Sequence, residues 1–125
     1  MFIEIRTTLT PFPASVGTAR RFVRDVLTTR MVGFVVVDTV ELLTSEVVTN
    51  ALVHARSAPE LSVEVRQDAV RVEVGDRSTS EPVLQQPGPE SASGRGMAIV
   101  EQLAAGWGVE QVGGHGKRVW FEVST

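Results

Sequence analysis

The sequence predicts an α+β fold, a two-layer sandwich in which helices cover one face of a mixed, mostly antiparallel sheet. Two short segments alternate between apolar and polar residues across a short link, which is typical of an antiparallel hairpin. Longer segments carry apolar residues at helical spacing. In chain order the patterns read strand, helix, helix, two strands, helix, two strands, which places the helices against one largely antiparallel sheet.

The first half of the chain predicts one strand and two helices. Residues 1–9 alternate in part and form the strand. Residues 15–28 have apolar side chains at helical spacing and form an amphipathic helix. Gly33 and the β-branched residues after it are expected to connect this helix to the next, either as a loop or partly as helix. Asp38 is expected to be the N-cap of a long helix that runs to about Ala55.

The second half predicts four strands, one long loop and one helix. In order these are strands 61–66 and 70–74, loop 75–96, helix 97–105, and strands 107–112 and 117–123. The loop is rich in Ser, Pro, Gly and Gln, and loops of this length inside a compact domain are usually functional. No repeat or change of composition divides the chain, so residues 1–125 are expected to form a single domain.

Composition excludes several classes of function. With a net charge of −3 and no basic stripe, the chain is not expected to bind nucleic acid directly. The absence of cysteine excludes disulfides and zinc–thiolate sites. No apolar run is long enough to cross a bilayer and no signal pattern begins the sequence, so a cytoplasmic location away from membranes is expected.

Three polar residues recur at intervals of four on the long predicted helix: Glu46, Asn50 and His54. They stack along one side of the helix, beside its apolar stripe. A carboxylate there can act as a general base, and an amide oxygen is a hard ligand suited to Mg²⁺. On spacing alone, the more common interpretation is that they are boundary residues on an exposed face.

Two further signals follow along the chain. Asp76 comes directly after the strand 70–74, where a carboxylate can accept a hydrogen bond from the amine of adenine, or simply form a turn. Gly94, Arg95, Gly96 and Met97 precede the third predicted helix. Free amides and the helix dipole make such a place an anion site, and Arg95 can add a bidentate phosphate contact. The alternative is an ordinary glycine-containing loop.

The order of these signals resembles the GHKL, or Bergerat-type, ATP-binding fold. More narrowly, it is similar to the anti-sigma-factor serine/threonine kinases and related short bacterial ATP-binding regulators. The resemblance extends over essentially the whole chain. It is carried by residues 42–51, 72–78, 94–100, 107–108 and 116–120.

This resemblance implies ATP and Mg²⁺ as ligands and gives each matching residue a role. Asn50 would coordinate Mg²⁺, Glu46 would be the catalytic base, and Asp76 would bind the adenine amine. Gly94, Arg95 and Gly96 would hold phosphates as part of a mobile lid. The full set of implied nucleotide-binding residues is Asn50, His54, Asp76, Ser78, Gly94, Arg95, Gly96 and Met97.

The resemblance also implies a function. A kinase of this family transfers the γ-phosphoryl group of ATP to a Ser or Thr of an anti-sigma-factor antagonist, mainly by positioning and charge stabilisation. It also sequesters a sigma factor and forms a homodimer. An alternative is a non-catalytic module in which ATP only tunes affinity for a protein partner. A sensor histidine kinase fragment is disfavoured, because no helical phosphoacceptor domain precedes residue 1.

Some positions depart from the family pattern or leave two interpretations open. After Asp76 the glycines of an Asp-x-Gly-x-Gly box are replaced by bulkier residues, which limit how closely the backbone can approach a nucleotide. Lys117 and Arg118 stand where many members have a Thr. On the first helix, Arg20, Arg21 and Arg24 form a basic face that either meets an acidic partner or is solvated.

Overall fold

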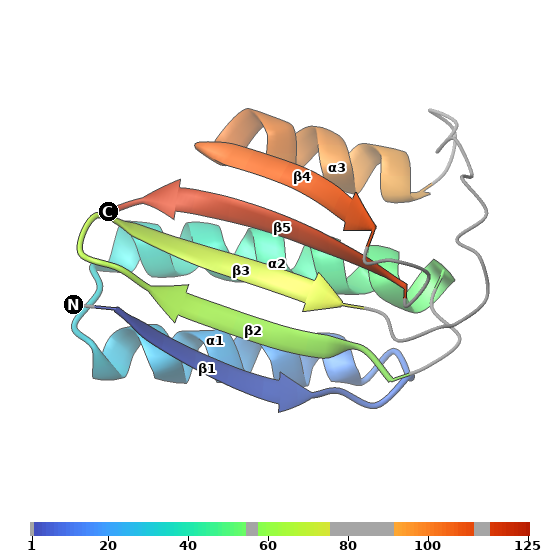
Figure 1. The fold of residues 1–125 in the computed structure, drawn as a ribbon, viewed down its shortest axis with the longest axis horizontal. Helices are drawn as coiled ribbons and strands as arrows, with labels where there is room; N and C mark the ends of the chain where they lie inside the picture. The colour runs from blue at the N-terminus through green and yellow to red at the C-terminus, as the bar shows by residue number, and fades with distance from the viewer. Residues whose placement is uncertain (1, 55–57, 76–91, 112–115) are drawn as a thin grey trace.

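The computed structural model describes residues 2–54, 58–75, 92–111 and 116–125. Within these ranges it contains a five-stranded sheet and three helices. The elements are β1 (Ile3–Thr8), α1 (Ser15–Thr29), α2 (Phe34–His54), β2 (Glu60–Val65), β3 (Ala69–Gly75), α3 (Ala92–Leu103), β4 (Gly106–Gln111) and β5 (Lys117–Ser124). The helices all lie on one side of the sheet (Figure 1). The predicted α+β sandwich is confirmed.

The strands follow the order β1-β2-β3-β5-β4 across the sheet. Each neighbouring pair is antiparallel, so the described sheet contains no parallel pair where a mixed sheet had been expected. The predicted hairpin is β2–β3, with Val63 opposite Val72. Val72 in turn lies opposite Phe121 of β5. This register aligns the apolar residues of three central strands on one face.

The core lies between that face of the sheet and the helices. Alternation along β2, β3 and β5 points every second side chain inward, and the helices contribute their apolar stripes. Fully burying one such Val, Leu or Phe side chain contributes roughly 1.5–3 kcal/mol. The inward-facing strand residues are Leu61, Val63, Val70, Val72, Val74, Val119, Phe121 and Val123. The helical ones are Ala19, Val23, Val26, Leu27, Val37, Val40, Leu43, Val47, Val48, Ala51 and Val100.

The prediction that Asp38 caps α2 is wrong, because the helix begins four residues earlier, at Phe34. The amide of Val37 donates to the carbonyl of Gly33 at 3.0 Å, which closes the first turn. β-branched residues weakly disfavour helix. Here Val37 and Val40 lie on the core face at 1% and 0% exposure, and this burial outweighs the propensity. Asp38 lies inside the helix and pairs with Arg24 at 3.5 Å.

The prediction that α3 begins at Met97 is also wrong, since the helix begins at Ala92. Gly94 and Gly96 therefore lie within its first two turns and not in a loop before it. Glycine costs about 1 kcal/mol relative to alanine inside a helix, which weakens a helix without forbidding it. Val100 is fully buried and Met97 packs against the core, so the second half of α3 anchors the first.

The basic face of α1 pairs with α2. Nη1 of Arg24 lies 3.1 Å from Oε2 of Glu41, and Nε of Arg20 lies 3.9 Å from Oε1 of the same carboxylate. Glu41 is mostly buried, with 13% of its side chain exposed, while the arginines are about half exposed. Two of the three arginines thus form ion pairs between α1 and α2. Whether the basic face also meets an acidic partner stays a prediction.

The other face of the sheet is polar and has no helix over it in the described structure (Figure 1). Arg71 lies over the ring of Trp120, 4.1 Å from its centroid. The indole also lies close to β4 at Gly106 and Gly108. This stack joins β3, β5 and β4. No helix in the described part of the chain is long and apolar enough to cross a membrane.

Candidate functional site

Three segments that the sequence singled out meet at one end of the molecule. α2 ends there at His54, β3 ends there at Gly75, and α3 begins there at Ala92, on the right-hand side of Figure 1. The antiparallel hairpin and the two helix directions produce this convergence. His54 and Ala92, which are 38 residues apart along the chain, therefore border one region.

α2 presents two different flanks on either side of its buried stripe. Glu41 pairs with α1. Glu46 follows five residues later, which rotates it by about 140° around the helix. α2 contacts both α1 and α3, and helical rotation places Glu46 and Asn50 on the flank away from Glu41 and α1. The predicted base and the predicted metal ligand thus share the flank of α2 that lies away from α1.

Asn50 is the most unusual residue of this flank. It is only 8% exposed, although its side chain is a polar amide. Within the described chain that amide has no hydrogen-bond partner. Among the described residues, the fully buried side-chain atoms without a partner are Oγ of Ser15 and Oγ1 of Thr44 and do not include the Asn50 amide. The amide of Asn50 is therefore largely buried but still accessible to a ligand. Glu46 lies one turn earlier, is half-buried, and likewise has no ion pair with a described residue.

The structure describes the remaining predicted site residues only in part or not at all. Asp76 and Ser78 lie outside the described residues, and Gly75 marks the point where β3 leads to them. The main chain of His54 ends α2, and its side chain is not described. The same holds for the side chain of Arg95, which lies in the first turn of α3.

The shifted start of α3 changes how an anion would bind. Amides in the first turn of a helix have no intrahelical acceptor and carry the positive end of the helix dipole. With the helix beginning at Ala92, Gly94 falls in this first turn, whereas Gly96 and Met97 fall in the second. Met97 is partly buried against the core. Of the predicted phosphate-binding residues, Gly94 therefore retains the best geometry for backbone contact.

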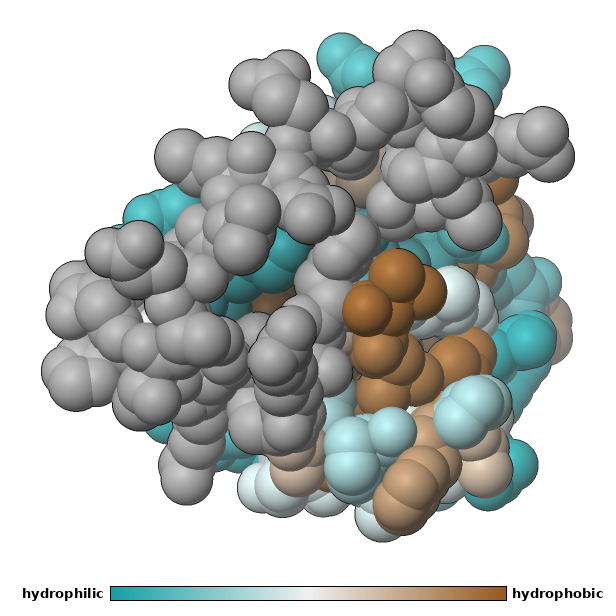
Figure 2. All heavy atoms as spheres, turned by 90° about the vertical axis from the view of Figure 1, so that its right-hand side faces the viewer, coloured by the Kyte–Doolittle hydropathy of each residue, from teal (hydrophilic) through white to brown (hydrophobic). Residues whose placement is uncertain are grey.

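Apolar surface is also available at this end. Figure 2 looks onto it and shows a group of apolar side chains at the surface with hydrophilic ones beside it. Val53, in the last turn of α2, is 64% exposed. It lies seven residues after Glu46 and so on nearly the same side of the helix. Small-molecule sites combine such apolar surface with a few polar groups that fix orientation.

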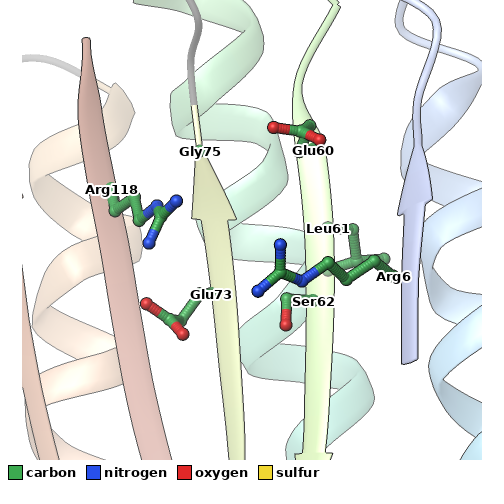
Figure 3. A pocket seen from close by; sticks show the side chains of 7 residues that line it. All are labelled: Arg6, Glu60, Leu61, Ser62, Glu73, Gly75 and Arg118. Carbon is green, nitrogen blue, oxygen red and sulfur yellow. The ribbon is translucent and has the colours of Figure 1, made fainter. Parts of the chain in front are cut away.

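A separate hollow lies on the opposite face of the sheet. It is lined by Arg6, Glu60, Leu61, Ser62, Glu73, Gly75 and Arg118. Figure 3 shows Arg6 and Arg118 extending toward one another over the two strands between them, with Glu73 below. Sequence reasoning did not find this hollow, because its side chains come from four strands with no local signal. Its two guanidinium groups are offset by two carboxylates, so its charge does not favour a polyphosphate.

Close to this hollow, Glu4, Glu64 and Glu73 bring carboxylate oxygens within 4.8 Å of one another. Each of them has an arginine close by: Glu4 pairs with Arg6 at 3.0 Å and Glu64 with Arg66 at 2.9 Å. Glu73 lies 3.7 Å from Arg71. These arginines already supply the positive charge that a metal ion would bring, and the cluster is an ion-pair network of the open face.

Comparison with known proteins decides the family. The model of the histidine kinase-like ATPase domain matches residues 9–123, nearly the whole chain. The chain belongs to the histidine kinase-like ATPase family. It is therefore an ATP-binding, ATPase-like domain with a GHKL-type fold. Among curated proteins, none matches the chain significantly.

Membership in the histidine kinase-like ATPase family agrees with the arrangement of the elements. The match includes all the positions predicted to bind ATP, from Glu46 to Met97. It does not distinguish an anti-sigma-factor kinase from other ATPase-like regulators. The roles of the individual residues remain predictions.

Proposed function

We propose that this domain binds ATP with Mg²⁺ on the α3 side of α2 and acts as a serine/threonine protein kinase of the anti-sigma-factor type. The observation that supports it most is the position of Asn50, whose amide is 8% exposed and makes no hydrogen bond with another described residue, so that it is free to bind a ligand. Its oxygen is a suitable ligand for Mg²⁺. The half-buried carboxylate of Glu46 lies one turn away on the same flank.

Each group has a defined role in this proposal. Asn50 holds the metal through its amide oxygen, and Mg²⁺ supplies charge neutralisation for the phosphates. Glu46 accepts the proton of the target Ser or Thr hydroxyl. The hydroxyl oxygen forms a bond to the γ-phosphorus of ATP, and the bond between that phosphorus and ADP breaks. Asp76 binds the adenine amine, and the first turn of α3 with Gly94 contacts phosphate.

The proposed protein partners are an anti-sigma-factor antagonist, which is phosphorylated, and a sigma factor, which is sequestered. The proposal includes a homodimer, following the resemblance to the anti-sigma-factor kinases. The second candidate is a non-catalytic module in which ATP alters affinity for a partner. The departures after Asp76 favour it, since bulkier residues there keep the backbone farther from the nucleotide.

The nucleotide site is tested by ATP titration with and without Mg²⁺. Wild type is expected to bind ATP more tightly with Mg²⁺, and Asn50→Ala is expected to lose that difference. Thr49→Ala is the control, because Thr49 is an exposed neighbour on the same helix. If Asn50→Ala keeps the full effect of Mg²⁺, the metal assignment is wrong.

The kinase step is tested separately with a candidate antagonist and γ-labelled ATP. Glu46→Gln keeps the shape of the side chain and removes the base, so it should retain ATP binding and lose phosphoryl transfer. Wild-type protein that binds both ATP and the antagonist without transferring phosphate would reject the kinase and leave the non-catalytic module.

A further inference from the structure

The strand β4 forms an edge of the sheet at which apolar side chains are only partly covered. Trp107 and Val109 lie opposite Phe121 and Val119 of β5, so they point to the same face of the sheet as the core. In β5 these positions are 0% and 3% exposed, whereas Trp107 is 36% exposed and Val109 is 53% exposed. The apolar face of the sheet therefore continues onto β4 without being fully covered.

The other edge of the sheet differs. β1 carries a charged pair, Glu4 with Arg6, and its inward residues Ile3 and Ile5 are only partly exposed. Charged side chains are a common protection of edge strands against pairing with another chain. β4 has one charged residue, Glu110, and two glycines, and it contains neither lysine nor proline. It lacks most of the devices that prevent strand addition.

The helix α3 makes room for one more strand. In Figure 1, which looks onto the sheet, α3 lies beside the outer edge of β4 and extends past it, and α3 contacts β4. Leu103, at the end of α3, is 46% exposed. A strand added to β4 would have its inward side chains between Trp107, Val109 and the exposed part of α3. That position corresponds to a sixth strand of the same two-layer sandwich.

The charged residues exposed near β4 indicate the chemistry of a partner segment. The side chain of Glu110 points to the open face, opposite Arg118, and its carboxylate lies 4.0 Å from Nη2 of Arg71. It is still 56% exposed, so a further cation can approach it. On the described side-chain part of α3, residues 97–103, the charged residue is Glu101, which is also exposed. Both are acidic. Because side chains alternate along a strand, an added strand would need apolar residues toward α3 and basic residues on the open face beside Glu110.

We propose that β4 is a docking site for an extended segment of another protein in which apolar and basic residues alternate. The segment would add antiparallel or parallel to β4, with main-chain hydrogen bonds supplying affinity and Trp107, Val109 and Glu110 supplying selectivity. A second copy of this chain fits less well. Two β4 strands paired by a two-fold axis would bring their α3 helices into the same space beside the edge.

The test uses a short capped peptide of alternating valine and lysine, with a valine–glutamate peptide as its charge-reversed counterpart, in the absence of nucleotide. Binding of the valine–lysine peptide should slow hydrogen exchange of the amides of residues 106–111 and leave β1 unchanged. Val109→Lys should weaken binding about tenfold, since it replaces an apolar contact by a repelled charge. Val35→Lys, the same change at an exposed valine of α2, should leave binding unchanged.

A second variant keeps the test independent of folding effects. Glu110→Lys should invert the preference, so that the valine–glutamate peptide binds more tightly than the valine–lysine one. Equal binding of both peptides to wild type, protection at β1 in place of β4, or equal loss in Val109→Lys and Val35→Lys would overturn the proposal. Protection of β4 on raising the protein concentration alone would assign the edge to self-association. None of these outcomes bears on ATP binding or phosphoryl transfer.

Discussion

Among single residues, Gly108 is constrained by the indole of Trp120. A Cβ atom at this position would lie 2.8 Å from Nε1 of Trp120 and 3.0 Å from Cε2. The ring cannot easily retreat, because Arg71 lies over it at 4.1 Å from the centroid. We expect Gly108→Ala to lower the free energy of unfolding by about 1–3 kcal/mol, the usual cost of overpacking a tight contact. Urea denaturation measures the change.

Gly106 provides the matched control on the same strand. A Cβ there would lie 3.7 Å from the Trp120 ring, an ordinary van der Waals distance. Gly106→Ala should therefore change stability little, although it alters strand propensity in the same way. An equal loss in both variants would show that the indole contact is not the cause.

At the scale of elements, α2 carries a buried hydroxyl that has no hydrogen bond to any described residue, Oγ1 of Thr44. Thr44 is 0% exposed and lies on the core face among valines and leucines. An unsatisfied buried hydroxyl costs about 1–3 kcal/mol. Thr44→Val keeps the shape and removes the hydroxyl, so it should raise the free energy of unfolding by about 1 kcal/mol. Thermal and urea denaturation together provide the measurement.

Thr39 on the same helix is the control. Its hydroxyl donates to the carbonyl of Val35 at 2.9 Å. Thr39→Val loses this bond and should bring no gain in stability. If both variants are stabilised alike, the gain comes from valine itself and not from the removal of an unpaired hydroxyl.

The elements that sequence could predict are those whose periodicity agrees with their packing. The β2–β3 hairpin and α1 follow directly from alternation and helical spacing. The starts of α2 and α3 could not be predicted, for opposite reasons. The valines before Asp38 have strand propensity, and only burial of Val37 reveals a helix. The glycines before Met97 suggest a loop, and only the packing of α3 shows otherwise.

For the whole molecule, the candidate site was predictable in part. The spacing of Glu46 and Asn50 indicated a common side of one helix, and the pairing of Glu41 with α1 places that side on the other flank of α2. Spacing could not reveal that Asn50 is 8% exposed, because burial depends on segments distant in the chain. The hollow around Arg6 and Arg118 could not be predicted either, since it exists only once four strands are in register.

Hydrogen exchange can distinguish the two places where ATP could bind, the α3 side of α2 and the hollow on the open face of the sheet. If the nucleotide lies on the α3 side of α2, ATP with Mg²⁺ should slow hydrogen exchange in the last turns of α2 and the first turns of α3. At about 100 times its dissociation constant, ATP should add about 2.7 kcal/mol to the free energy of unfolding. Exchange measured by mass spectrometry and thermal denaturation give the two readouts. The stabilisation in Asn50→Ala should be smaller and independent of Mg²⁺. Slowed exchange around Ser62 and Arg118, with α2 and α3 unchanged, would instead place ATP in the hollow of the open face and contradict the proposed site.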